Sequence, residues 1–172
     1  MEPEIIMKDA FNVIGYELRT TTNEGKNLRE IPEFWSRYHE NNRGALIPGK
    51  KYPAVVLGIC CDFDRKTNLF SYVIGFENVG EADVPDGMVV KHLPALKYAV
   101  FTTPEVKMEE FTRSIQKTTG YIYSEWLPES GFEYNGEGVD IEVYDERCSP
   151  DREYVQMDVC VPVKYSLAEV LQ

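Results

Sequence analysis

GVDIEVYDERCSPDREYVQMDVCVPVK, residues 138–164, is the stretch that decides the fold of this chain. Its pattern predicts two strands, 139–146 and 153–163, joined by a turn through residues 148–151. Apolar side chains occupy the odd positions of both strands: Val139, Ile141, Val143, Val155, Met157, Val159, Val161 and Val163. Because successive side chains of a strand point to opposite faces of the sheet, we expect this odd-numbered set to face a core.

The even positions of the same strands carry acids and tyrosines. They are Asp140, Glu142, Tyr144, Tyr154, Gln156 and Asp158. We expect them to share the face opposite the core, where side chains on neighbouring strands touch. If that face is open to solvent, the cluster has little meaning. If another part of the chain covers it, the face is predicted to bind a molecule that favours acidic and aromatic groups together.

The length and composition indicate one globular domain. The chain has 172 residues, of which 43% are hydrophobic, so residues 1–172 suit a single domain with a substantial core. There is no apolar run of about 18 residues. The acidic start, Met1-Glu2-Pro3-Glu4, lacks the layout of a secretion signal. We therefore expect a cytoplasmic protein that does not engage a membrane.

The cysteines and histidines are too few and too scattered to predict a metal site or a cofactor. Cys60 and Cys61 are adjacent, which is not a C-x-x-C spacing, and His39 and His92 are the only imidazoles. Reduced thiols, mostly buried, are expected. The sequence shows neither a Gly-rich phosphate loop nor a Gly-x-Ser-x-Gly or Cys-His arrangement. If the protein is an enzyme, a carboxylate that directs water or a proton is the chemistry that this composition supplies.

The net charge of −11 limits the choice of partner. It opposes nucleic-acid binding, which needs a positive surface to displace counterions. It favours cationic small molecules, which the field of the whole protein attracts. Charge of this sign also serves solubility alone, so it does not by itself identify a ligand.

The rest of the chain alternates strands with helices. Strands are predicted at 10–20, 54–63, 69–77 and 97–102, and helices at 27–42 and 108–126. Asn27 and Glu30 are spaced as a capping box at the start of the first helix. Pro128 is expected to end the second helix. The polar stretch 78–87 is the best candidate for a seam within the chain.

Each half of the chain therefore runs strand, helix, strand, strand, with the halves at about residues 8–78 and 88–164. We expect an α+β fold built from two such units of antiparallel sheet related by an approximate twofold axis. The helices are expected on one side, and the opposite sheet faces are expected to line a central groove. A ferredoxin-like pair is the alternative, because the order β-α-β-β can pair its strands in more than one way.

Several segments of the chain stand out together, namely Pro85-Asp86-Gly87-Met88, Leu93-Pro94-Ala95, Tyr98-Ala99-Val100-Phe101, Glu125-Trp126-Leu127-Pro128-Glu129-Ser130-Gly131-Phe132, Glu142-x-Tyr144-Asp145 and Val159-Cys160-Val161-Pro162-Val163. These segments resemble the GyrI-like proteins, which are also the effector-binding domains of some AraC- and MerR-type transcription activators. They follow the family order over nearly the whole chain, and the run from Trp126 to Phe132 is the most specific of them.

The resemblance implies a duplicated β-α-β-β fold whose groove accepts bulky, often cationic molecules. In drug-sensing members a carboxylate in the groove pairs with the positive charge of the ligand, and Glu142 best matches it. Some stand-alone members are instead hydrolases of cyclopropane-bearing alkylating compounds. This chain has no room for a helix-turn-helix, so we expect a stand-alone member.

The other candidate ligand-binding residues are aromatic or acidic, and each has an ordinary structural alternative. Tyr144, Tyr154 and Tyr72 are predicted to stack on a flat cation, or else to pack across strands. Trp35 and Trp126 lie at helical spacing, which is typical of a core, although an edge position beside a groove is also open to them. Asp158 shares the predicted acidic face with Glu142, near a strand end where solvation is expected.

Three functions fit these features. The first is a small-molecule-binding protein, a monomer, that senses or sequesters aromatic, cationic compounds, including drugs, with Glu142 as the charge partner. The second is a hydrolase of electrophilic xenobiotics, with Glu142 as the catalytic residue. The third is an acidic interaction module acting on DNA gyrase, as the resemblance to GyrI implies.

Overall fold

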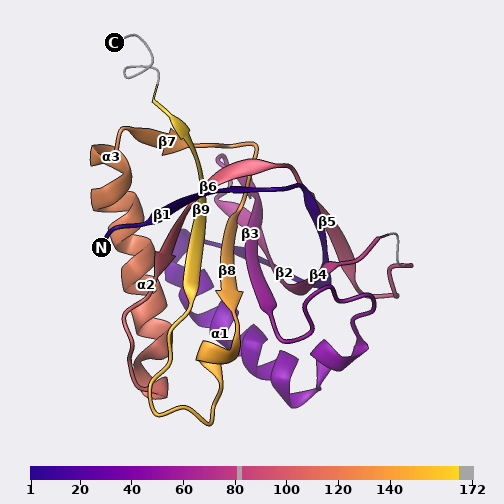
Figure 1. Ribbon diagram of the computed structural model, residues 1–172. Coiled ribbons are helices and arrows are strands. Elements are labelled where there is room, and N and C mark those ends of the chain that lie inside the picture. Colours follow the sequence, from indigo (N-terminus) through magenta and orange to yellow (C-terminus); the bar gives the residue numbers. More distant parts are fainter. Residues whose placement is uncertain (81–82, 167–172) are drawn as a thin grey trace. The chain divides into compact units, whose positions relative to one another are not determined.

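The computed structural model describes residues 1–80 and 83–166 (Figure 1). The chain divides into two compact units. One is Phe11–Leu93, and the other combines Met1–Ala10 with Pro94–Gln172. Within the described residues, no helix is both long enough and apolar enough to cross a membrane.

The unit Phe11–Leu93 is an antiparallel sheet with one long helix. Its elements are β2 (Phe11–Thr21), α1 (Lys26–Glu40), β3 (Val56–Asp64), β4 (Leu69–Asn78) and β5 (Val89–Leu93), with short turns η1 (Asn23–Gly25) and η2 (Arg43–Leu46) beside α1. The strand order is β3-β4-β2-β5. The apolar side of α1, which includes Phe34 and Tyr38, packs on the sheet with Ile14, Tyr72 and Ile74.

The second unit is also an antiparallel sheet covered by a helix. Its strands are β1 (Glu4–Lys8), β6 (Leu96–Thr102), β7 (Phe132–Tyr134), β8 (Asp140–Tyr144) and β9 (Asp158–Tyr165). Their order is β1-β6-β9-β8, and β7 pairs with β9 as well. Its helical segments are η3 (Met108–Glu110), α2 (Phe111–Tyr121), η4 (Ile122–Trp126) and α3 (Leu127–Glu129), and η5 (Glu146–Cys148) follows β8. Figure 1 shows α2 alongside β9.

The two units repeat one pattern of strand pairing. The order β3-β4-β2-β5 in one corresponds to β8-β9-β6-β1 in the other. In each unit the strand before the helix, β2 or β6, pairs on one side with the last strand of the repeat, β4 or β9. On its other side, β2 pairs with the edge strand β5, and β6 pairs with the edge strand β1. The predicted α+β class, with antiparallel strands and two principal helices, is therefore confirmed.

Most predicted elements lie within a few residues of their observed positions, but three strands were missed. β1, β5 and β7 have at most five residues each, which is too short for a clear alternation. The stretch 78–87, predicted as a seam within the chain, connects β4 to β5 of the same unit. Residues 81–82 of this stretch lie outside the described part.

The predicted capping box is wrong. Helix α1 begins at Lys26, after Gly25 in a left-handed conformation, and no side chain caps it. The carboxylate of Glu30 accepts a hydrogen bond from the Thr20 hydroxyl at 2.6 Å instead. The side chain is thus used to join α1 to β2, and Gly25 turns the chain into the helix because it tolerates a positive φ.

The prediction that the even positions of the last two strands share one face is also wrong. In the observed register Glu142 lies opposite Val159, and Val143 lies opposite Asp158. Residues opposite each other in a sheet point to the same face, so even positions of β8 join the odd positions of β9. Glu142 therefore lies on the face that α2 covers, where Phe101, Ile122 and Val159 form the core.

Candidate functional site

Acids and tyrosines gather on the helix-covered face of β8. We call Tyr123, Tyr134, Asp140, Glu142 and Tyr144 the acid–tyrosine cluster. Asp140, Glu142 and Tyr144 alternate along β8, so they point to one face of the strand. All five residues belong to the unit that includes α2.

Glu142 is oriented by its neighbour on the same strand. The hydroxyl of Tyr144 donates a hydrogen bond to Oε2 of Glu142 at 2.9 Å. The ring of Tyr144 meets Phe111, the first residue of α2, edge to face with their centroids 6.3 Å apart. A carboxylate that is held by a hydroxyl and bordered by rings can accept a cation whose body stacks on those rings.

Asp140 is the most shielded acid of the cluster. Its Oδ2 accepts a hydrogen bond from the Tyr123 hydroxyl at 2.5 Å. Its Oδ1 is buried and has no hydrogen-bond partner. Burial raises the pKa of this carboxyl to about 6, the charge of Glu142 acts in the same direction, and hydrogen bonds from Tyr123 and Tyr134 oppose the shift.

A π-helical turn brings Tyr123 to Asp140. The turn spans Ile122–Trp126 and directly follows α2. Such a turn holds one residue more than an α-helical turn and changes the direction of the side chains beyond it. Ile122 is fully buried, whereas Tyr123 is 38% exposed. The ring of Tyr123 also lies 6.3 Å from that of Tyr134 on β7.

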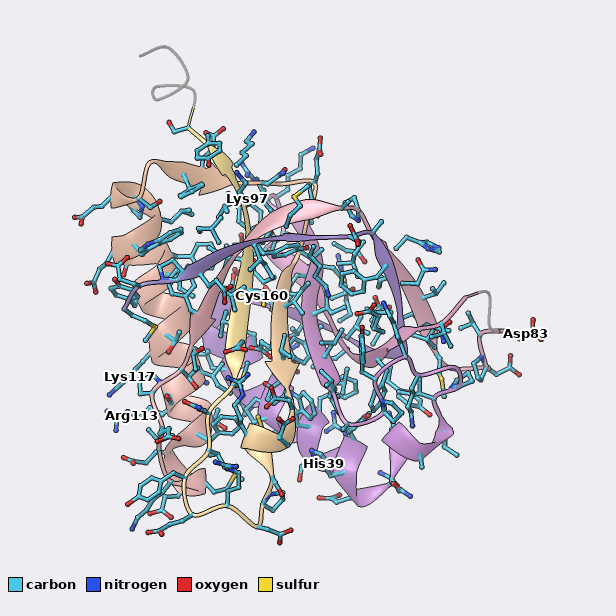
Figure 2. The ribbon with its side chains drawn as sticks, in the orientation of Figure 1. His39, Asp83, Lys97, Arg113, Lys117 and Cys160 are labelled. Atoms are coloured by element: carbon cyan, nitrogen blue, oxygen red, sulfur yellow. The ribbon has the colours of Figure 1, made fainter. Side chains whose placement is uncertain are left out.

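The cations of α2 do not point toward this face. Arg113 and Lys117 are exposed, and Figure 2 shows both on the side of α2 that faces away from β9. The charged groups of α2 are therefore turned to solvent, while its apolar side covers the sheet.

Two of the predicted ligand-binding aromatics are brought together in the other unit. The indole Nε1 of Trp35 on α1 donates a hydrogen bond to the Tyr72 hydroxyl on β4 at 3.0 Å. Tyr72 is completely buried, and Trp35 stacks on His39 with their ring centroids 5.6 Å apart. Both rings are thus held in fixed positions, and their role in binding stays a prediction.

Asp158 and Tyr154 are not brought to Glu142. Asp158 points to the other face of the sheet and forms an ion pair with Arg147 at 2.6 Å. The same guanidinium binds Asp145 at 2.8 Å. Tyr154 lies outside β9 and is 46% exposed. The predicted strand 153–163 begins too early, because the chain between Asp145 and Asp158 is a loop that Arg147 holds.

Trp126 packs against the core of the unit that includes α2. Its ring meets Phe101 edge to face at 5.0 Å and stacks on Phe132 at 6.0 Å between centroids. It also lines an open surface cleft of about 460 Å³ together with Glu2, Tyr121, Glu125 and Glu129. It is thus mainly a core residue, as helical spacing usually indicates.

Sequence reasoning missed three members of the cluster. Asp140 was grouped with the acidic face but not named as a ligand-binding residue, Tyr134 lies on a strand that was not predicted, and Tyr123 depends on the π-helical turn. Only the alternation of Asp140 with Glu142 gave a signal. No group of three or more histidine, cysteine, aspartate or glutamate residues in the described ranges is arranged to hold a metal ion.

Comparison with known proteins identifies relatives over nearly the whole chain. A family model described as "Integron-associated effector binding protein" matches residues 4–163. The transcriptional regulator BrlR of Pseudomonas aeruginosa is 36% identical over 165 residues, which are 95% of this chain and 56% of that protein. The chain therefore spans about half the length of this curated relative.

Solved structures share the fold. SAV2435 bound to tetraphenylphosphonium has a TM-score of 0.77 at 18% identity, covering 95% of this chain and 94% of that one. An integron cassette protein from the mobile metagenome of Vibrio cholerae has a TM-score of 0.65 at 15% identity, covering 95% and 96%. Together with the family match, these structures confirm the resemblance to GyrI-like effector-binding domains.

Proposed function

The chain belongs to the family of integron-associated effector-binding proteins, and on this basis we propose that it binds bulky, aromatic cations with Glu142 as their charge partner. The rings of Tyr144, Tyr123 and Phe111 supply the stacking surface. The biological role that follows is sensing or sequestration of such compounds, including drugs.

One observation carries the proposal, namely the Glu142 carboxylate held by the Tyr144 hydroxyl at 2.9 Å beside the ring of Phe111. A carboxylate that is partly removed from water loses solvation, and a cation restores part of that lost free energy. Aromatic faces next to it add about 0.5–2 kcal/mol per cation–π contact. A neutral aromatic ligand gains neither the ion pair nor a cation–π contact and can only stack on the rings, so charge decides selectivity.

The relatives support the ligand class. SAV2435 binds tetraphenylphosphonium, a cation surrounded by four phenyl rings, and it shares the fold of this chain. BrlR is a transcriptional regulator. In a transcriptional regulator, a domain that binds an effector can act as the sensor. This fits the proposed role of sensing aromatic cations.

Titration with tetraphenylphosphonium by calorimetry tests the proposal. We expect Glu142→Gln to weaken binding by about 10- to 100-fold, because a charge-assisted contact contributes roughly 1.5–3 kcal/mol. Glu146→Gln is the matched control, since Glu146 is exposed on η5 and its loss removes the same charge.

Equal affinities of the two variants would show that Glu142 is not the charge partner. A neutral probe of similar shape, tetraphenylmethane made soluble with uncharged substituents, should bind both variants alike. If the wild type binds neither probe, the chain does not bind compounds of this class.

A further inference from the structure

We propose that Asp140 is a second carboxylate of this binding site, and that it releases a proton when a cation binds, so that affinity for the cation rises with pH. This inference rests on the proposed function, because it concerns the regulation of the same site. In this proposal Glu142 forms the direct ion pair with the cation, and the protonation of Asp140 adjusts the affinity.

The geometry places the two carboxylates side by side. Asp140 and Glu142 are two residues apart on β8, and alternate residues of a strand lie roughly 7 Å apart on one face. Oδ2 of Asp140 is bound by the Tyr123 hydroxyl, whereas Oδ1 is buried and accepts no hydrogen bond. A buried oxygen without a partner is unfavourable when it carries charge, so the empty site favours a protonated Asp140.

The groups that surround Asp140 act on its proton in both directions. They are Tyr123 of the π-helical turn, Tyr134 of β7 and Glu142 of β8, and Asp140 in turn acts on Tyr98 of β6 and Cys160 of β9. None of these groups is positive at neutral pH. The charge of Glu142 favours the proton, whereas the hydrogen bonds from Tyr123 and Tyr134 favour the ionised form. Burial raises the pKa of Asp140 to about 6, in agreement with the geometry.

Binding of a cation reverses this balance. A positive charge beside Glu142 also acts on Asp140, two residues away on the same strand, and favours its ionised form. The carboxylic acid then loses its O–H proton to the solvent and keeps the electron pair as a carboxylate, so one proton leaves for each cation bound. Below the pKa of the empty site, affinity should therefore rise up to tenfold per pH unit and level off above it.

The experiment measures tetraphenylphosphonium affinity at pH 5, 6, 7 and 8 by calorimetry, in two buffers of different ionisation enthalpy. For the wild type we expect affinity to increase about tenfold between pH 5 and pH 7, with proton release at pH 5 and none at pH 8. Asp140→Asn keeps the shape of the side chain but cannot ionise. Its affinity should not change with pH, and it should release no proton.

Tyr123→Phe provides a second, milder variant. It removes the hydrogen bond that favours the ionised form of Asp140, so the pKa of Asp140 should rise. The midpoint of the affinity profile should then move to higher pH by about one unit.

Two failures are distinguishable. If the wild type and Asp140→Asn bind tetraphenylphosphonium with the same pH profile and proton count, Asp140 does not exchange a proton and the inference is wrong, while the proposed function stands. If the wild type does not bind at pH 8, the proposed function fails and the inference fails with it.

Discussion

The buried carboxyl of Asp140 shows the cost of placing an acid beside another acid on a covered face. Its pKa is raised from 3.8 to about 6, so the folded state holds the proton more tightly than the unfolded state. The contribution of this group to stability is then highest below pH 3.8, falls as pH rises to about 6 and stays reduced above it. Two pKa units correspond to roughly 3 kcal/mol as an upper value.

This cost predicts that Asp140→Asn stabilises the protein at high pH. We expect the free energy of unfolding to rise by about 1–3 kcal/mol at pH 8 and to change little at pH 4. Urea denaturation at both pH values measures it. Asp151→Asn, at an exposed position, is the control and should change stability little at either pH. A loss of stability at pH 8 would show that the ionised carboxyl is needed for folding.

The Trp35–Tyr72 hydrogen bond makes a separate prediction in the other unit. Trp35→Phe keeps an aromatic ring but removes the donor to the Tyr72 hydroxyl. We expect a loss of about 1 kcal/mol in unfolding free energy, the usual value for one hydrogen bond. A double-mutant cycle with Tyr72→Phe should give a coupling energy of similar size. Additive losses would mean that the two residues act independently.

At the scale of elements, β2 and β4 depend on two facing glycines. Gly15 pairs with Gly75, and a Cβ added to Gly15 would lie 2.2 Å from the carbonyl oxygen of Ile74. That atom belongs to the backbone, so it cannot move aside without disturbing the strand. The backbones of the two strands therefore approach closely at Gly15.

Gly15→Ala should therefore destabilise the protein by more than about 3 kcal/mol, because the two strands must separate to admit the methyl group. Gly120→Ala is the matched control in α2, where the added Cβ meets nothing within 4 Å. It should stabilise the protein by about 0.5–1 kcal/mol, the difference in helix propensity. Thermal unfolding of both variants gives the comparison, and similar melting temperatures would contradict the predicted clash.

The loop between β8 and β9 decides the face of Glu142. Arg147 binds Asp145 and Asp158 at its two ends, and Thr102 of β6 also donates to Asp158 at 2.7 Å. These contacts hold β8 and β9 in a register that pairs even with odd positions. A shift of one residue would move every side chain of β8 to the other face.

At the scale of the whole molecule, the two units carry the same strand order, and the family match covers residues from both. Along the chain, the edge strand β1 is followed by β2 of the other unit, and the edge strand β5 is followed by β6 of the other unit. The chain therefore passes between the units twice. The net charge of −11 belongs almost wholly to the unit of Met1–Ala10 and Pro94–Gln172, which has 18 acidic and 8 basic residues, so that unit has the field that attracts cations.

The sequence by itself determined the α+β class and the alternation of the longer strands with the two principal helices. These properties depend on residues close together in the chain, whose spacing repeats with the period of a strand or a helix. The resemblance to GyrI-like proteins also singled out Glu142, and the alternation of Glu142 with Tyr144 placed both on one face of a strand.

Only the tertiary structure decided which face these residues occupy and which groups join them. The register of β8 on β9 depends on how a long loop is held. The contact of Tyr123 with Asp140 depends on a π-helical turn, which leaves no period in the sequence. Burial of Asp140 needs partners from η4 and β7, so the raised pKa and the proposed proton release follow from packing between distant segments.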